Sequence, residues 1–334
     1  MKELVKKLVE TYGPAGDEEE ISRVIQTEIE DYVDQISKDP MGNLIALKKG
    51  QSADKKVMLA AHMDEIGLIA THIDDDGFIR FSNVGGVSPH TLIGERVLFN
   101  GETVGVVDKE GKLEKISDLK NSKMYIDIGA SSKEEAKKKV KIGDTASYYR
   151  NLNDLGDRIT AKSLDDRTGC AVLIKTLKEL DQPTYDTYFV FTVQEEVGTR
   201  GSKVSAYGIN PDLGIAVDVT LTGDMPEAKR MAVSLGAGPA IKVKDATVLA
   251  NPQVKEMMVK LAKKNEIPYQ LEVLKRGGTD TGSIQLTRDG VLAGALSIPA
   301  RHVHSPSEMV DINDLKNSVQ LLRKILVSNY NNLI

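Results

Sequence analysis

Cysteine and tryptophan are nearly missing from this sequence of 334 residues, which has a single cysteine, Cys170, and no tryptophan. One cysteine cannot form an intramolecular disulfide, so the composition fits a reducing compartment and predicts a cytoplasmic protein. Because Cys170 lies in an apolar helical run, we interpret it as a small core residue and not as a catalytic thiol. The lack of tryptophan, a common stacking partner of sugars, argues mildly against a polysaccharide substrate.

Long apolar runs and an excess of positive charge are also missing. No segment approaches the length needed to cross a membrane, and the N-terminal residues MKELVKKLVETYG show no signal-peptide pattern. The formal net charge of -5 gives no reason to expect a polyanionic partner. Apolar residues make up 40% of the chain and charged residues 28%, which is typical of a soluble globular protein. We therefore expect neither a membrane nor a nucleic acid as a partner.

Two kinds of hydrophobic pattern divide the chain. In residues 1–66 and 157–334, continuous apolar runs such as VMLAA and LGIAV alternate with amphipathic helical segments. This pattern predicts an α/β domain with a mixed, mainly parallel sheet flanked by helices on both faces. In residues 67–156, short alternating strands are separated by Gly and Asp turns, which predicts a small β-barrel domain inserted into the α/β domain.

Four of the apolar strands end in residues that can bind metals. VMLAA runs into His62 and Asp64, YFVFTVQ into Glu195 and Glu196, LGIAV into Asp218, and ALSIPARHV into His304. In open α/β sheets, ligands bind at the carboxyl ends of the strands. Four separate strands that deliver such residues to one edge therefore indicate a functional site.

The spacing of these residues suggests different tasks. His62 and Asp64 are two apart, so their side chains point the same way, and Asp64 can hold one ring nitrogen while the other binds a metal. Glu195 and Glu196 are adjacent, so one can bind a metal while the other acts as a general base. The alternative for this pair, two exposed loop acids, fits the apolar strand before them poorly.

A fifth segment, SLDDRTG, places two acids at the start of an amphipathic helix. We interpret Asp165 as a metal ligand and Asp166 as an N-cap. His302 and His304 are two apart, so spacing does not decide which of them binds a metal. His72 and His90 fall in the inserted domain and are expected to be non-catalytic.

The ligand set of histidine and carboxylate without cysteine suits zinc or cobalt at a hydrolytic site, with manganese as a further possibility. Two histidines and several carboxylates exceed what one tetrahedral ion needs. The set therefore suggests two divalent ions that share a bridging carboxylate.

Six motifs resemble those of the M42 metallo-aminopeptidases in order and spacing, over nearly the whole chain. They are AHMDEIG, SLDDRTG, VQEEVGTRG, AVDV, RGGTDTG and RHVHSP. The resemblance implies a zinc-peptidase-like fold and an aminopeptidase that acts on peptides. It implies that His62 and Asp218 bind one metal, that Glu196 and His304 bind the other, and that Asp165 bridges them.

The same resemblance implies that Glu195 is the general base, that Asp64 orients His62, and that the peptide after Asp165 is cis. It also implies that the inserted domain serves dimerisation, and that the dimers build a homo-oligomer, a dodecamer, which encloses the active sites. The chain departs from the family at His302, where tyrosine is common, which leaves His304 as the better match for the ligand.

Three other functions stay open at this point. A glycosidase would need two opposed carboxylates several ångströms apart, which the adjacent Glu195 and Glu196 supply poorly. Another metal-dependent amidase, such as a deacylase or a carboxypeptidase, would use a similar ligand set. A non-catalytic assembly or binding protein would not need the full set. The preferred amino-terminal residue is equally open: Lys242, Lys244, Lys275 and Arg276 could favour acidic side chains or could be solvated surface residues.

Overall fold

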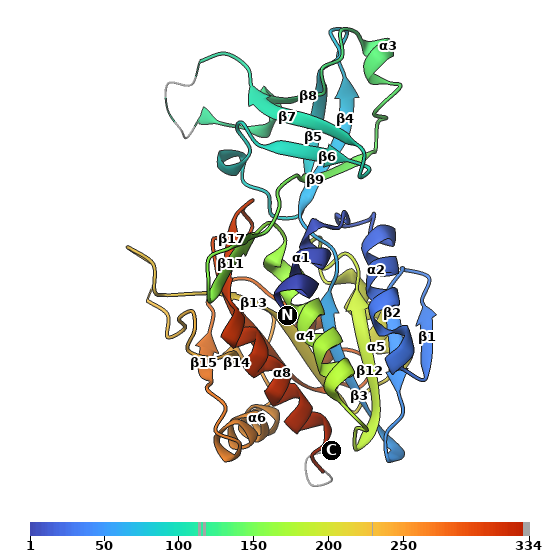
Figure 1. The fold of residues 1–334 in the computed structure, drawn as a ribbon, viewed down its shortest axis with the longest axis vertical. Coiled ribbons are helices and arrows are strands. Elements are labelled where there is room, and N and C mark those ends of the chain that lie inside the picture. Colours follow the sequence, from blue (N-terminus) through green and yellow to red (C-terminus); the bar gives the residue numbers. More distant parts are fainter. Residues whose placement is uncertain (113–114, 116–117, 229, 330–334) are drawn as a thin grey trace.

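A computed structural model describes residues 1–112, 115, 118–228 and 230–329, and shows a small β-barrel standing on one end of a larger α/β domain (Figure 1). The predicted fold class is confirmed. The domain limits proposed from the sequence, 1–66 with 157–334 and 67–156, stay a prediction, and residues 113–114, 116–117, 229 and 330–334 of those ranges lie outside the described residues.

The α/β domain is built on a mixed sheet whose central strands are parallel. Its order is β1 (Gln35–Lys38), β2 (Leu44–Lys48), β12 (Tyr185–Thr192), β3 (Ser52–His62), β13 (Leu213–Leu221), β16 (Leu292–Arg301), β17 (Glu308–Asp311), β11 (Arg158–Ala161) and β10 (Asn153–Asp154). A branch adds β14 (Ala240–Lys244), antiparallel to β16, and β15 (Gln270–Val273), parallel to β14. Strands β12, β3, β13 and β16 run parallel to one another, so their carboxyl ends meet at one edge.

Helices cover both faces of this sheet. Those on one face are α1 (Lys2–Glu10), α2 (Glu19–Ile29), α4 (Leu164–Glu179), α6 (Pro252–Lys264) and α8 (Ile312–Leu326). The other face is covered by α5 (Arg200–Ile209) and α7 (Asp280–Gln285). Alternate residues of β3 therefore enter different cores: Val57 and Leu59 pack toward α4, whereas Met58 and Ala60 pack toward α5 and α7. This double burial explains why the strand is continuously apolar.

The barrel closes through six antiparallel strands. Their order is β4 (Gly67–Ile73), β5 (Ile79–Val84), β8 (Met124–Asp127), β7 (Thr103–Lys109), β6 (Arg96–Phe99) and β9 (Thr145–Tyr148), and α3 (Lys133–Ala136) lies outside the ring. Strand β4 begins five residues after His62, so the barrel stands over the carboxyl edge of the large sheet (Figure 1). Among the described residues, no helix combines the length and the apolar character that a membrane span requires.

Candidate metal centre

The predicted ligands come from strand ends that lie side by side. His62 is the last residue of β3, Asp218 lies in the carboxyl half of β13, and Glu196 follows the end of β12. His304 lies in the connection between β16 and β17, and Asp165 lies at the start of α4. The chain leaves each parallel strand at its carboxyl end through a helix or a loop. Residues at these ends therefore gather at one edge of the sheet.

Asp165 lies between the two histidines and presents one carboxylate oxygen to each. Its Oδ1 is 3.1 Å from Nε2 of His62, and its Oδ2 is 3.3 Å from Nε2 of His304. Nε2 of His62 is also 3.9 Å from Oδ1 of Asp218, and Nε2 of His304 is 3.3 Å from Oε2 of Glu196. The structure thus brings all five predicted ligands into one cluster.

Two overlapping groups in this cluster have the geometry to hold an ion. The ligand atoms of His62, Asp166 and Asp218 lie within 4.8 Å of one another, and so do those of His62, Asp165 and Glu196. Imidazole nitrogen together with carboxylate oxygen suits zinc and similar divalent metals. The donor set therefore fits a divalent cation.

Asp166 is a fully buried carboxyl with two distinct oxygens. Oδ1 accepts a hydrogen bond from the backbone N–H of Gly169 at 3.0 Å, as the N-cap interpretation predicts. Oδ2 is buried without a hydrogen-bond partner in the structure. The backbone of Asp165 and Asp166 is not helical and the peptide bond between them is cis, so the regular helix begins only after Asp166. An unsatisfied buried carboxylate oxygen beside His62 is a further reason to expect a cation there.

The charges of the cluster shift one another's pKa values. Burial alone would lower the pKa of His304, but hydrogen bonds to Asp165 and Glu196 outweigh it and raise that pKa to about 11. Burial would raise the pKa of Asp165, but its bonds to the two imidazoles hold it well below its usual range. Burial, reinforced by neighbouring carboxylates, raises the pKa of Asp218 and of Glu195 well above the ordinary carboxyl value. The site is thus short of positive charge, which a divalent cation would supply.

Asp64 holds the backbone of the predicted base. Its Oδ1 accepts a hydrogen bond from the N–H of Glu195 at 3.0 Å, and its Oδ2 accepts one from the N–H of Glu196 at 3.1 Å. Nδ1 of His62 lies 3.1 Å from the backbone oxygen of Asp64 and 3.5 Å from its Oδ1. Asp64 therefore contacts His62, and it also fixes the loop after β12, a contact that no pattern in the sequence predicts.

Two further buried acids support the ligand loops and were missed from the sequence. Oε1 of Glu18 accepts hydrogen bonds from the N–H groups of Gly16 and Gln194. The carboxylate of Glu308 accepts from the N–H groups of Asp165 and His304. Acids of this kind follow no apolar strand, so no strand-end pattern marks them.

The barrel reaches the cluster through two adjacent glycines in the loop after β5. A Cβ atom added to Gly85 would lie 3.1 Å from Cβ of Glu196, and one added to Gly86 would overlap the imidazole of His304. Side chains are therefore excluded at both positions by close approach. This loop therefore lies against two of the candidate ligands, Glu196 and His304.

The remaining sequence candidates lie elsewhere. His302 is exposed, whereas His304 contacts the cluster; His72 and His90 are exposed on the barrel. Lys242 is buried and pairs with Glu272 at 2.7 Å and with Asp245 at 3.2 Å, so it is not free to bind an acidic substrate.

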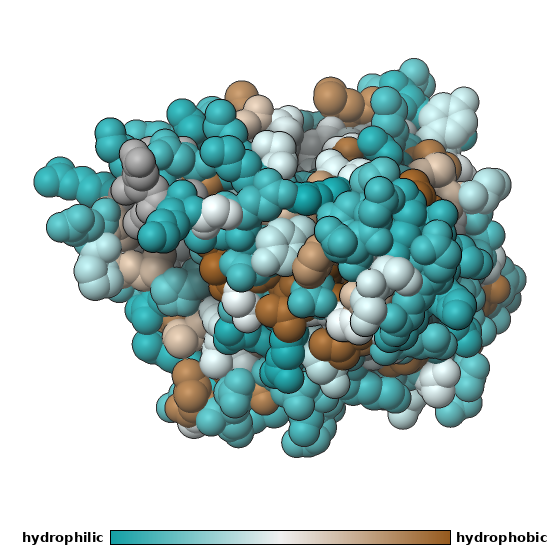
Figure 2. All heavy atoms as spheres, turned by 90° about the horizontal axis from the view of Figure 1, so that it is seen from above, coloured by the Kyte–Doolittle hydropathy of each residue, from teal (hydrophilic) through white to brown (hydrophobic). Residues whose placement is uncertain are grey.

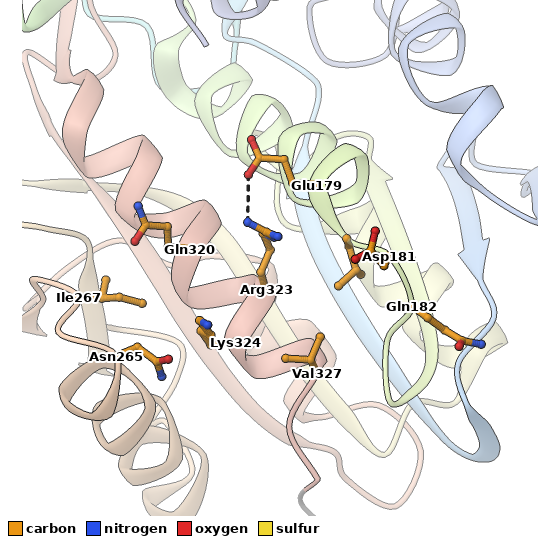
Figure 3. A pocket seen from close by; sticks show the side chains of 10 residues that line it. Glu179, Asp181, Gln182, Asn265, Ile267, Gln320, Arg323, Lys324 and Val327 are labelled. Carbon is orange, nitrogen blue, oxygen red and sulfur yellow. Dashed lines mark hydrogen bonds and ion pairs between the residues drawn. The ribbon is translucent and has the colours of Figure 1, made fainter.

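The loop RGGTDTG approaches the site through Asp280, whose Oδ2 accepts a hydrogen bond from Oγ1 of Thr192 at the end of β12. A pocket of about 610 Å³ lies at the opposite end of α4, and no candidate ligand lines it (Figure 3). Its rim carries the Arg323–Glu179 ion pair, at 3.2 Å. It is therefore separate from the cluster.

Comparison with known proteins identifies the relatives of this chain. Residues 42–321 match the family described as M42 glutamyl aminopeptidase. A candidate aminopeptidase of Acetivibrio thermocellus is 54% identical over 322 residues, which cover 96% of this chain and 97% of the relative. The solved aminopeptidase APDkam598 of Desulfurococcus kamchatkensis has a TM-score of 0.94 at 42% identity, over 98% of this chain and 94% of that one. The TET1 peptidase of Pyrococcus horikoshii, which can assemble into a tetrahedron or a large octahedral shell, has a TM-score of 0.88 at 34% identity, over 98% and 99% of the two chains.

Proposed function

Since the chain belongs to the M42 family and is an aminopeptidase, we propose that two divalent cations and the carboxylate of Glu195 carry its reaction. The observation that carries this proposal is the position of Asp165, with one oxygen toward His62 and the other toward His304. His62 and Asp218 would hold one cation, Glu196 and His304 the other, and Asp165 both. Zinc or cobalt suits this set best, with manganese as a further candidate.

The cations, when bound, supply Lewis-acid polarisation of the substrate carbonyl and lower the pKa of water. The protein must still move one proton. Glu195 accepts a proton from the attacking water, whose oxygen bonds to the carbonyl carbon of the first residue. When the carbon–nitrogen bond breaks, Glu195 donates that proton to the leaving amine nitrogen. The products are a free amino acid and a peptide shortened by one residue.

Asp64 prepares Glu195 for this task by fixing its backbone. The two hydrogen bonds to the N–H groups of Glu195 and Glu196 hold the backbone of both residues beside His62. Burial, with further effect from Asp218, keeps the pKa of Glu195 raised, which suits a group that must both take and return a proton.

The barrel is the proposed dimerisation domain, and dimers would build a larger homo-oligomer. The solved TET1 peptidase, which can assemble into a tetrahedron or a large octahedral shell, supports a large assembly. The outer face of β7 exposes Val104 and Val106, which are 40% and 44% accessible. Seen from the barrel end, the surface is mostly hydrophilic, with smaller apolar groups between the polar ones (Figure 2). The cytoplasmic location inferred from the single cysteine belongs to this proposal.

A Glu195→Gln variant tests the assignment of the base. It should lower kcat by about 100- to 10,000-fold, the usual contribution of a general base, while both cations remain bound. A matched Glu102→Gln variant, at an exposed carboxylate of the barrel, should retain full activity. Near-normal turnover of Glu195→Gln would show that another group moves the proton.

A substrate panel separates the rival reactions. Aminoacyl chromogenic amides with free amino groups should be cleaved, whereas the same amides with blocked amino groups should not. Removal of the blocking acyl group, with the chromogenic amide left intact, would indicate a deacylase, and metal-independent release of reducing sugar from glucans would indicate a glycosidase. The panel run with zinc, cobalt, manganese and magnesium also identifies the preferred metal.

A further inference from the structure

Glu308 is a buried acid at the start of β17 that touches two candidate ligands without being one. Its side chain is 2% exposed. Oε2 accepts a hydrogen bond from the N–H of Asp165 at 2.9 Å, and Oε1 accepts one from the N–H of His304 at 2.8 Å. One carboxylate therefore joins the start of α4 to the connection between β16 and β17.

Both of these amides belong to backbone that lacks regular secondary structure. Asp165 has φ -79° and ψ 107°, before the regular part of α4 begins, and His304 has φ +61°, in the left-handed region. A buried N–H without a partner costs free energy, so each of these amides needs an acceptor. The carboxylate of Glu308 accepts a hydrogen bond from each amide. Because the distance between its two oxygens is fixed, it also sets the distance between the two amides.

Glu308 is buried, and each of its two oxygens accepts a hydrogen bond from the backbone N–H of a proposed ligand. Asp314 is another buried acid that bonds in this way, and it accepts hydrogen bonds from the N–H groups of Gly236 and Gly238, each at 2.8 Å. The loop that Asp314 holds carries no candidate ligand. Asp314 is therefore the comparison for Glu308, because the same arrangement has only a structural role there.

We infer that Glu308 is a positioning residue that sets the separation of Asp165 and His304, and thereby the affinity for the cation held by His304 and Glu196. This inference rests on the proposed two-cation function. A residue that forms hydrogen bonds to metal ligands typically contributes about 10- to 100-fold to the metal affinity. The effect should fall mainly on this cation, because Glu308 bonds to the backbone of two of its proposed ligands, Asp165 and His304, whereas it bonds to only one proposed ligand of the other cation, Asp165.

Cobalt titration of the metal-free protein, followed by visible absorbance, tests the inference without measuring activity. The wild-type protein should bind two cations. Glu308→Gln, which keeps one acceptor oxygen and removes the charge, should raise the Kd of one cation by about 10- to 100-fold and leave the other within about twofold. Asp314→Asn is the matched control and should leave both Kd values within about twofold of wild type.

A second background identifies the affected cation. In His304→Ala the cation at Glu196 is already lost, so adding Glu308→Gln should change the Kd of the remaining cation by no more than about twofold. Glu308→Asp, too short to reach both amides, replaces Glu308→Gln in these titrations if that variant does not fold, and should weaken the same cation.

Failure of the proposed two-cation function and failure of the positioning role of Glu308 would give different results. A wild-type protein that binds no cation would overturn the proposed function itself. A wild-type protein that binds two, together with Glu308 variants that bind both with unchanged Kd, would overturn only the positioning role. Equal weakening by Glu308→Gln and Asp314→Asn would do the same, because it would reflect a general loss of structure.

Discussion

The α/β domain and the barrel both have a buried core, but they differ in whether they bury charged side chains. Among the described residues, every buried charged side chain lies in the α/β domain, whereas the buried polar side chains of the barrel are Thr145 and Ser147. The barrel core is apolar, from Leu68 to Tyr148. In the α/β domain, buried acids and bases surround the edge where β3, β12 and β13 end.

The buried charges should lower the stability of the α/β domain and not that of the barrel. Burying an unpaired charge is expensive, so a domain that needs only to hold its shape avoids it, as the barrel does. The α/β domain buries Asp165, Asp166, Asp218 and Glu308 close to two imidazoles. Such a concentration is reasonable where cations complete the cluster, and its position at the strand ends follows from the parallel sheet.

The largest expected effect contrasts two histidines that are two residues apart. His304→Ala should lower kcat/KM by at least about 1,000-fold, since a direct ligand should matter more than the 10- to 100-fold typical of groups behind the ligands. His302→Ala should change it by less than about threefold, because His302 is exposed. Steady-state kinetics at saturating metal measures both. Equal losses would mean that the left-handed turn, and not the imidazole of His304, is what the site requires.

The next expected effect is the loss of stability that results from ionising the buried carboxyl of Asp314. Burial raises the pKa of Asp314 to about 6, against an unfolded value of about 4. The folded state therefore holds this proton more tightly, and the wild-type free energy of unfolding should fall, relative to that of Asp314→Asn, as pH rises from about 4 to about 6. At about 1.4 kcal/mol per pKa unit, the change is at most about 3 kcal/mol.

Urea unfolding of both proteins across this pH range gives the difference directly. Below about pH 4 the side chain is protonated in both states, so the two curves should run parallel there. A difference that is flat from pH 4 to 7, or that grows in favour of the wild type, would contradict the assigned cost.

Gly86→Ala tests the point at which the two regions meet. The added methyl group would overlap the imidazole of His304, and Gly86 has no left-handed backbone that would strain alanine by itself. We expect a loss of about tenfold in kcat/KM from the displaced ligand, with little change in folding. Gly208→Ala, where nothing lies within 4 Å, is the control and should retain full activity. Unchanged activity of Gly86→Ala would show that the barrel loop does not constrain the site.

The smallest effect on the folded monomer should come from the barrel surface. Val106→Lys, on the exposed face of β7, should change the free energy of unfolding by no more than about 0.5 kcal/mol. It should nevertheless shift the assembly toward smaller species, which light scattering detects, if this face joins two copies. An unchanged particle mass would place the dimer contact elsewhere on the molecule.

Strand ends were the most predictable part of this protein. The apolar runs that became β3, β12, β13 and β16 are long and continuous, and each has a candidate ligand in its carboxyl half or shortly after its end. Helix α5 was not predicted, because RGSKVSAYGI combines two glycines with few apolar positions. Strand β14 was also missed, since AIKVK is short and carries two lysines, one of which, Lys242, is buried in an ion pair that no local pattern reveals.

The supporting groups of the site were less predictable than its ligands. Glu308 precedes a short strand and looks like a surface acid in the sequence, and only the folded chain shows that it lies between two distant amides. That Asp64 orients His62 stays a prediction, and its second contact, with the loop of Glu195, follows from no pattern in the sequence. Contacts of this kind depend on how separate segments meet, and local periodicity carries no information about that.

We propose that two cations share the carboxylate of Asp165, one on the side of His62 and the other on the side of His304. Anomalous diffraction from crystals grown with zinc tests this proposal most directly. We expect two peaks, one between Asp165, His62 and Asp218 and the other between Asp165, Glu196 and His304. A fully active crystal preparation with no anomalous peak among these five residues would contradict it.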